Sequence, residues 1–371
     1  MTVIAGLLLN NIPALIGDVL ITAPGPSDKK LCTPTAENVN TFFEPQYAHV
    51  SALRQKVNIL SDKVMVAWAG SYLHARALIR EMKAEIDRDS RPEVIIDVLK
   101  SWPAEDMKEL SVIAFARGEQ KTTIDWYGPI LHLNSSIFTK VLLSGSGMED
   151  LGALIRHMEK GDIFIDERLP DPQKMALYAL VLGSQAAGWE YVTQENLSNY
   201  WGGIVEIGMY NGGNTSKLGD VLYWFWEFDI PSNELRAHST FIKQEYQDDL
   251  LVTYTLSSDD APRIVVVPPL LSSYNDAEKV KIAPPKLSYK WLCNCVVMRD
   301  GETTVDIFSR VELLHNAHPI RFETKRSMPF GGGLISSSTT ATIDKQYVRE
   351  IEQQVGQRLG RLKSLEAGGE R

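Results

Sequence analysis

Cysteine is scarce in this chain of 371 residues, which contains only Cys32, Cys293 and Cys295. An odd and sparse set excludes a disulfide framework and is typical of a reducing compartment. Cys293 and Cys295 alternate along an expected strand, so their side chains point to one face. A metal site would need two more ligands at suitable spacing, and the sequence offers none. We therefore expect packing residues here, with no metal and no cofactor.

Basic residues and long apolar runs are also few. The chain has 38 Lys and Arg against 47 Asp and Glu, a formal net charge of −9. This balance excludes a general nucleic-acid-binding surface, which needs clustered basic residues. The apolar N-terminus lacks the basic region and cleavage site of a signal peptide and contains Asp18, and no other run is long enough to span a membrane. We expect a cytoplasmic protein without nucleic-acid or membrane partners.

Hairpins and helices alternate in the first part of the chain. Strand patterns alternate or run apolar, whereas helical patterns repeat every three to four residues. Strands are expected at 3–9, 14–22, 55–60, 63–69, 110–117, 121–127, 139–144 and 203–209, and helices at 71–88, 91–101, 149–159 and 171–189. A long loop rich in Pro and Asn occupies 23–50. This order predicts an α+β fold in which two antiparallel sheets are flanked by helices, an αββα layering.

The rest of the chain changes character after Gly213. Strand patterns recur from 220 to 342, separated by breaks at Pro268-Pro269 and Pro284-Pro285, and a helical pattern follows at 344–363. We predict two domains, 1–213 and a mostly-β domain over 214–371 with a C-terminal helix.

Two features of the first domain suggest chemistry. Asp18 lies in an apolar strand pattern, where an unpaired carboxylate is rarely buried, and Lys56 is a natural partner for it. In "KVNILSDKVMVAWAGS", a strand ends at Ala69-Gly70-Ser71 and leads into a helix. Such a turn exposes a backbone N–H that can bind a phosphate or a developing oxyanion.

These motifs resemble the proteasome β subunits and the bacterial HslV peptidase, both N-terminal-nucleophile hydrolases. The resemblance covers about 2–210 and is carried by Thr2, "IGDVLIT", the interval from Lys56 to Gly70, "LLSGSG" and "WGGIVEI". Two segments depart from the family. The loop 23–50 is longer, and Ser198-Asn199-Tyr200-Trp201 replaces the acidic residue and serine that precede the family's Gly-Gly.

The resemblance implies a four-layer N-terminal-nucleophile hydrolase sandwich and a threonine peptidase. Removal of Met1 would leave Thr2 as nucleophile, with its own α-amine as the base. Lys56 would lower the pKa of the amine, Asp18 would orient Lys56, the Gly70 N–H would bind the oxyanion and Ser146 would hydrogen-bond near the amine. Asn196 or Ser198 would only partly replace the missing acidic residue.

The resemblance also suggests a substrate pocket and partners. It places Trp68, Ile21 and Tyr72 in substrate binding, and Trp68 can equally be a core aromatic residue. The expected substrate is a peptide or unfolded protein, processed in a homo-oligomeric ring with an ATPase partner. Two alternatives remain open: an N-terminal-nucleophile amidase acting on a small molecule, and a catalytically inert ring or scaffold component.

Overall fold

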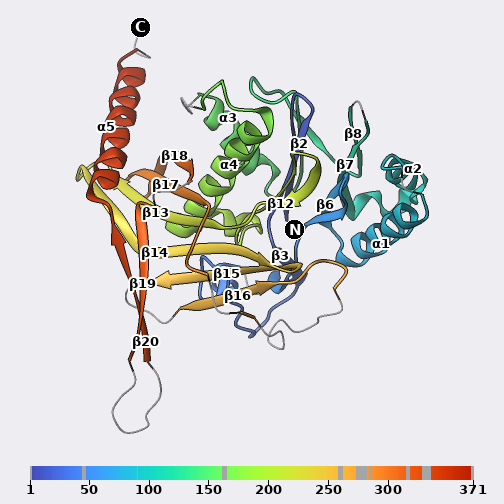
Figure 1. The fold of residues 1–371 in the computed structure, drawn as a ribbon, viewed down its shortest axis with the longest axis horizontal. Helices are drawn as coiled ribbons and strands as arrows, with labels where there is room; N and C mark the ends of the chain where they lie inside the picture. Colours follow the sequence, from blue (N-terminus) through green and yellow to red (C-terminus); the bar gives the residue numbers. More distant parts are fainter. Residues whose placement is uncertain are drawn as a thin grey trace.

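The protein combines helices with several β-sheets, an α+β fold (Figure 1). The computed structural model describes residues 2–43, 47–89, 91–119, 121–160, 165–257, 262–272, 282–283, 286–314, 318–327 and 336–368. Within these ranges, most expected strands and helices are present with shifts of a few residues at their ends.

The first sheet has six strands in the order β12-β11-β2-β1-β10-β9. Its central strand β1 (Val3–Leu9) is apolar at every position and pairs antiparallel with β2 (Ile12–Gly17) and β10 (Lys140–Gly145). A continuous apolar run is typical of a strand buried on both faces. The remaining strands are β9 (Leu131–Leu133), β11 (Glu206–Asn211) and β12 (Asn214–Lys217).

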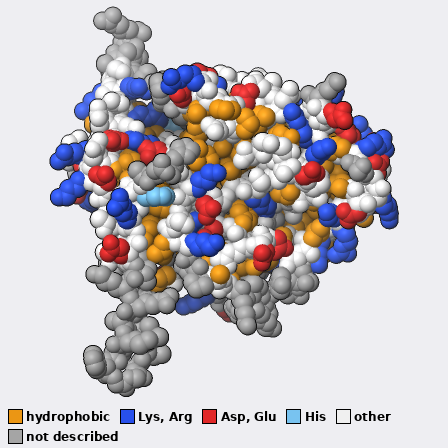
Figure 2. Space-filling view, viewed as in Figure 1, with side chains coloured by type: hydrophobic (Ala, Val, Ile, Leu, Met, Phe, Trp, Pro, Cys, Tyr) orange, Lys and Arg blue, Asp and Glu red, His pale blue; other side chains and the backbone are white. Residues whose placement is uncertain are grey.

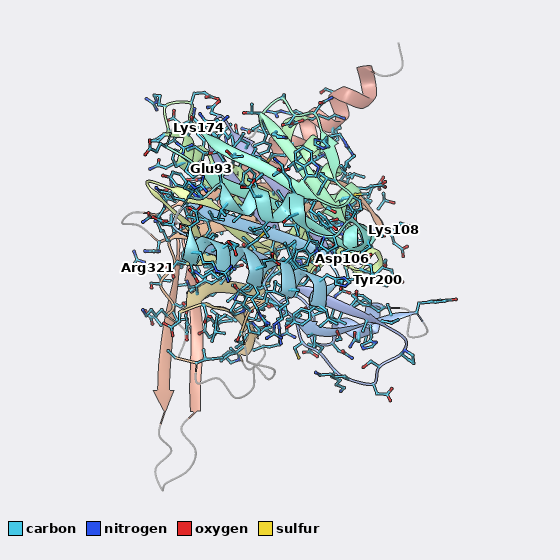
Figure 3. All side chains as sticks on the ribbon, turned by 90° about the vertical axis from the view of Figure 1, so that its right-hand side faces the viewer. Glu93, Asp106, Lys108, Lys174, Tyr200 and Arg321 are labelled. Carbon is cyan, nitrogen blue, oxygen red and sulfur yellow. The ribbon has the colours of Figure 1, made fainter. Side chains whose placement is uncertain are left out.

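The second sheet has the order β5-β6-β7-β8 and is antiparallel throughout. Its strands are β5 (Val57–Ser61), β6 (Val64–Gly70), β7 (Leu110–Arg117) and β8 (Thr122–Tyr127). Helices α1 (Tyr72–Arg88) and α2 (Val94–Ser101) pack their apolar sides against one face of it. Figure 3 shows these helices side by side in front of the sheet. Ser71 starts α1 by accepting a hydrogen bond from the His74 N–H, a regular N-cap.

The two sheets share a core that is separate from the helices. Ile4 and Leu15 of the first sheet pack with Met65, Ile113 and Phe115 of the second. Helices α3 (Met148–Lys160) and α4 (Asp171–Thr193) contact the opposite face of the first sheet. Each of these sheets therefore packs against helices on one face and against the other sheet on the other.

A third sheet, in the order β16-β15-β14-β13-β17-β18, packs on the far side of α4. Because α4 lies between two sheets, it is apolar on nearly all sides. The strands are β13 (Val221–Asp229), β14 (Glu234–Gln247), β15 (Leu250–Ser257), β16 (Arg263–Val267), β17 (Trp291–Asp300) and β18 (Thr303–Leu313). Helix α5 (Lys345–Gly368) and the hairpin of β19 (Ile320–Ser327) and β20 (Ser336–Ile343) follow, and they extend in opposite directions in Figure 1.

Two expected strands have different boundaries. The strand expected at 14–22 ends at Gly17, and β3 (Leu20–Pro24) pairs instead with β4 (Ala48–Leu53). Asp18 directly follows β2, and its carboxylate accepts hydrogen bonds from two backbone N–H groups. The strand expected at 203–209 begins at Glu206, since the backbone at Gly202, Gly203 and Ile204 has positive φ.

The long loop and the domain boundary also differ in detail. The ends of the expected loop 23–50 belong to the β3–β4 pair, and the described residues between these strands contain one 3₁₀ turn, η1 (Val39–Phe42). The expected boundary after Gly213 falls in the β11–β12 hairpin, and β12 remains in the first sheet. The third sheet therefore begins with β13, and it shares a hydrophobic core with α4.

The surface and the helices give two further observations. Lys and Arg side chains are mixed with Asp and Glu over the face shown in Figure 2. Among the described residues, no helix is both long enough and apolar enough to cross a membrane.

Candidate active site

Thr2 lies immediately before β1, and the side chains of two expected site residues contact it. Its hydroxyl donates a hydrogen bond to Asp18 Oδ1, and its backbone nitrogen donates to Ser146 Oγ at 3.1 Å. Ser146 in turn donates to the Thr2 carbonyl at 3.3 Å. Thr2 is completely buried. The structure therefore brings Thr2, Asp18 and Ser146 together from three separate parts of the chain.

Asp18 is a buried carboxylate that accepts hydrogen bonds on both oxygens. Besides Thr2, the backbone N–H groups of Val3 and Gly202 donate to it at 3.2 and 3.1 Å. Burial raises the pKa of Asp18, while the nearby Lys56 ammonium and these hydrogen bonds act in the opposite direction. All its hydrogen-bond partners are donors, which favours the ionised form.

Lys56 is also buried, just before β5, and its environment shifts its pKa toward neutral pH. Burial lowers the pKa of Lys56 from 10.5 to about 8, and the carboxylates of Asp18 and Glu206 partly oppose this change. The Lys56 ammonium lies 4.2 Å from the centroid of the Trp68 ring. Gly17 allows this approach, because a Cβ at Gly17 would lie 2.7 Å from the Lys56 Cβ. Lys56 thus interacts with Asp18 electrostatically, and the expected orientation of Lys56 by Asp18 stays a prediction.

Glu206 extends the set of buried charges beyond the predicted residues. Its carboxylate accepts a hydrogen bond from the Val57 N–H at 2.6 Å and forms an ion pair with Lys217 at 2.7 Å. Burial raises the pKa of Glu206 and lowers that of Lys217, and each charge opposes the effect on the other. Asp18, Lys56, Glu206 and Lys217 therefore form a row of alternating charges.

The Gly145-Ser146-Gly147 turn is held against Thr2 by Trp201. The Gly147 N–H donates to the Thr2 carbonyl at 3.3 Å. The indole of Trp201 packs against Gly147, leaving no room for a side chain there, and its Nε1 donates to Asp150 Oδ2 at 2.7 Å. Trp201 lies in the segment that departs from the pattern of the resembled family, and its contact with Gly147 gives it a structural role.

Glu190 is a site residue that the sequence did not reveal. It is completely enclosed within α4 and its surroundings, and its two oxygens accept the Gly203 N–H at 3.0 and 2.9 Å. The Asn196 amide donates to it at 2.7 Å and the Thr35 hydroxyl also donates. Burial raises the pKa of Glu190, and these hydrogen bonds oppose the effect. Successive amides of Gly202 and Gly203 thus bind two carboxylates, one of which contacts Thr2.

Of the two residues expected to replace the missing acidic residue, Asn196 is buried and Ser198 is exposed. Asn196 donates to Glu190 and to the Trp201 carbonyl, and neither hydrogen bond involves Thr2. The carboxylate of Glu190, from α4, therefore lies next to Gly202-Gly203. A glutamate in the largely apolar second half of the helix was the available signal for it.

Gly70 ends β6 in the backbone conformation that favours glycine, with φ of 96°. It is exposed, and a side chain would collide with the Glu109 carbonyl. Among the hydrogen bonds of the described residues, none joins Gly70 to Thr2. Its part in oxyanion binding stays a prediction.

The three residues expected to bind substrate belong to one hydrophobic cluster. Trp68 is completely buried and packs with the helix-covered face of the second sheet, and Ile21 and Tyr72 pack against the same cluster. The Trp68 Nε1 donates a hydrogen bond to the Gln55 carbonyl at 3.2 Å. These contacts place Trp68 in the core beside Lys56. A role in substrate specificity stays a prediction.

Comparison with known proteins gives no family for this chain. No family model matches it, and no curated protein is significantly similar to it.

Proposed function

We propose that this protein is a threonine peptidase of the N-terminal-nucleophile type, with Thr2 as the nucleophile after removal of Met1. The observation that carries the proposal is the convergence on Thr2 of Asp18, which contacts the hydroxyl, and Ser146, which contacts the backbone nitrogen. Lys56 supplies positive charge beside Asp18. The proposal includes the αββα sandwich, which is supported by the packing of each of the first two sheets between helices and the other sheet.

The proposed reaction begins with transfer of the Thr2 hydroxyl proton to the free α-amine, directly or through water, as Oγ1 attacks the peptide carbonyl carbon. An α-amine has a pKa of about 7.7–8, so it can accept a proton near neutral pH. The tetrahedral intermediate expels the amine of the leaving peptide, which takes up the proton, and an ester on Thr2 remains. Water then hydrolyses the ester and restores the hydroxyl.

Positive charge at Lys56 favours the neutral form of the α-amine and stabilises negative charge on Oγ1. Because the pKa of Lys56 is about 8, this charge is present near neutral pH and is lost at higher pH. An N–H donor such as that of Gly70 would contribute about 3 kcal/mol of oxyanion stabilisation. The homo-oligomeric ring and the ATPase partner belong to the same proposal.

One observation favours the inert alternative. Thr2 is completely buried in the chain that begins with Met1, so a substrate can reach it only if it becomes exposed. Exposure of Thr2 on maturation is therefore part of the peptidase proposal. The alternative is a ring or scaffold component in which Thr2 has only a structural role.

Mass spectrometry of the intact protein tests the proposal directly. We expect a chain without Met1 that gains the mass of one inhibitor when treated with an epoxyketone, which reacts with both the hydroxyl and the amine of an N-terminal threonine. Thr2→Ala should abolish the adduct, whereas Thr22→Ala, a half-buried threonine in β3, should leave it unchanged. A chain without Met1 that forms no adduct and cleaves no peptide would instead support the inert role.

A further inference from the structure

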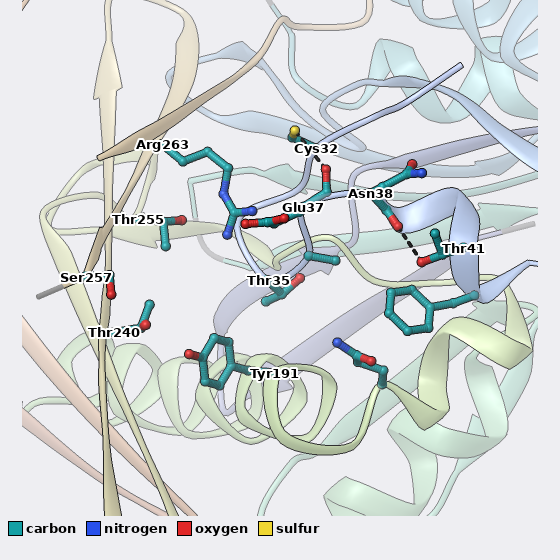
Figure 4. A pocket seen from close by; sticks show the side chains of 13 residues that line it. Cys32, Thr35, Glu37, Asn38, Thr41, Tyr191, Thr240, Thr255, Ser257 and Arg263 are labelled. Carbon is teal, nitrogen blue, oxygen red and sulfur yellow. Dashed lines mark hydrogen bonds between the residues drawn. The ribbon is translucent and has the colours of Figure 1, made fainter. Parts of the chain in front are cut away.

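A large cavity lies outside the Thr2 site, where the segment between β3 and β4 meets α4 and the third sheet. It has a volume of about 850 Å³. Its walls include Thr35 and Glu37 from the segment, Tyr191 from α4, and Thr240, Thr255 and Arg263 from the sheet (Figure 4). A hydrogen bond from Thr255 Oγ1 to the Pro34 carbonyl, at 2.9 Å, ties the segment to the sheet.

The sheet wall of this cavity is formed by cross-strand neighbours. Thr255 pairs with Arg263, and Thr240 pairs with Ser257. Residues directly opposite one another, and residues two apart on one strand, project from the same face of a sheet. The register therefore places three hydroxyl side chains and one guanidinium on the same wall.

Arg263 provides the positive charge of the cavity and Glu37 the negative charge. Figure 4 shows their charged groups turned toward each other in the cavity. The Nε of Arg263 is buried and has no hydrogen-bond partner in the part of the chain that the structure describes. The other polar lining groups are hydroxyls, the thiol of Cys32 and the amides of Asn38 and Gln194. Such a lining has one charge of each sign and many neutral donors and acceptors.

A carboxylate is the ligand group that best suits Arg263, because its two oxygens match the parallel N–H groups of a guanidinium. A polyanion is disfavoured, since Glu37 would repel it and one arginine would leave charge uncompensated. Hydroxyl and amide side chains can pair with peptide N–H and C=O groups. We propose that this cavity binds the C-terminal end of a short peptide, with the terminal carboxylate at Arg263.

The cavity is connected to the candidate active site through Thr35. Thr35 lines the cavity, and its hydroxyl donates a hydrogen bond to Glu190. Glu190 accepts a hydrogen bond from the Gly203 N–H, and the neighbouring Gly202 N–H donates to Asp18. Peptide in the cavity would thus contact a residue whose hydrogen bond orients this part of the site. Binding itself requires no reaction at Thr2, so it can be tested separately from the proposed peptidase activity.

Isothermal titration calorimetry of the full-length Thr2→Ala protein provides the test. The probes are tetra-alanine with a free C-terminal carboxylate and tetra-alanine amide. We expect the free acid to bind at least about tenfold more tightly than the amide, because only the acid can form the charged pair with Arg263. Arg263→Gln should remove this preference. Arg236→Gln is the matched control, since Arg236 is an exposed arginine of β14 in the same sheet.

Equal affinity of the acid and the amide would overturn the proposal, as would the absence of binding by either peptide. This comparison needs no change at Arg263 and so does not depend on how well that variant folds. A preference for the acid that persists in Arg263→Gln would also refute the assignment. Thermal unfolding of each variant establishes that it is folded before titration.

Discussion

Replacement of Lys56 by methionine should remove a pH dependence of stability that this buried lysine produces. Burial places the pKa of Lys56 at about 8 in the folded protein, against 10.5 for an ordinary lysine. Between these values the unfolded chain binds more protons at this position than the folded chain. The free energy of unfolding therefore rises with pH across this window, where the folded lysine is neutral and the unfolded one is still charged.

The size of this effect follows from the two pKa values. The interval from 10.5 to about 8 corresponds to about 3 kcal/mol, because one pKa unit is worth about 1.4 kcal/mol. The assay is urea unfolding of the parent and the Lys56→Met variant at about pH 7 and about pH 10. We expect the parent to gain about 2–3 kcal/mol relative to the variant between these conditions. Methionine keeps most of the packing volume and removes the charge.

Lys63→Met is the matched control, because Lys63 is exposed in the turn between β5 and β6. Its stability relative to the parent should change little between the two conditions. A difference between parent and Lys56→Met that is the same at both pH values would refute the assignment of a lowered pKa to Lys56. The electrostatic part of the proposed mechanism would then lose its basis.

Two further substitutions test the groups around Thr2. Glu190→Gln should lower the free energy of unfolding by about 1–3 kcal/mol, because every partner of Glu190 is a donor and an amide N–H would face one of them. Urea unfolding checks this, and unchanged stability would show that the carboxylate is dispensable. Trp201→Phe removes the hydrogen bond to Asp150 but keeps most of the ring against Gly147, so we expect a loss of about 1 kcal/mol. Thermal unfolding measures it, and Trp201→Ala should be several-fold more destabilising because it leaves a cavity.

The elements that could be predicted from the sequence are those with a continuous periodic pattern. The helix expected at 71–88 is present as Tyr72–Arg88, and the strand expected at 110–117 is present as Leu110–Arg117. The pattern failed at 14–22, where apolar residues continue across Asp18 although the chain changes from one sheet to another. Hydrophobicity reports that both strands are buried, but it does not report which neighbour each one pairs with.

The candidate site was predictable where a residue broke its local pattern. Asp18 is a carboxylate in an apolar run, and burial of such a group requires partners; the structure supplies Thr2 and Gly202. Glu190 breaks the pattern of α4 in the same way, but nothing in its own helix identifies its partners. Asn196 and Gly203 follow 6 and 13 positions later, but Thr35 lies 155 positions away along the chain, so only the tertiary structure brings it to Glu190.

The row of buried charges is hard to explain by stability alone. Asp18 interacts with Lys56, Lys56 with Glu206, and Glu206 with Lys217, each pair being opposite in sign. Pairing offsets part of the cost of burial, yet apolar residues of similar volume often give equal or greater stability than buried ion pairs. Perturbed titratable groups gather at functional sites because reactions require them. The row ends at Asp18, whose carboxylate contacts the hydroxyl of Thr2, the proposed nucleophile. The cost of burying these charges would serve a reaction at that end of the row.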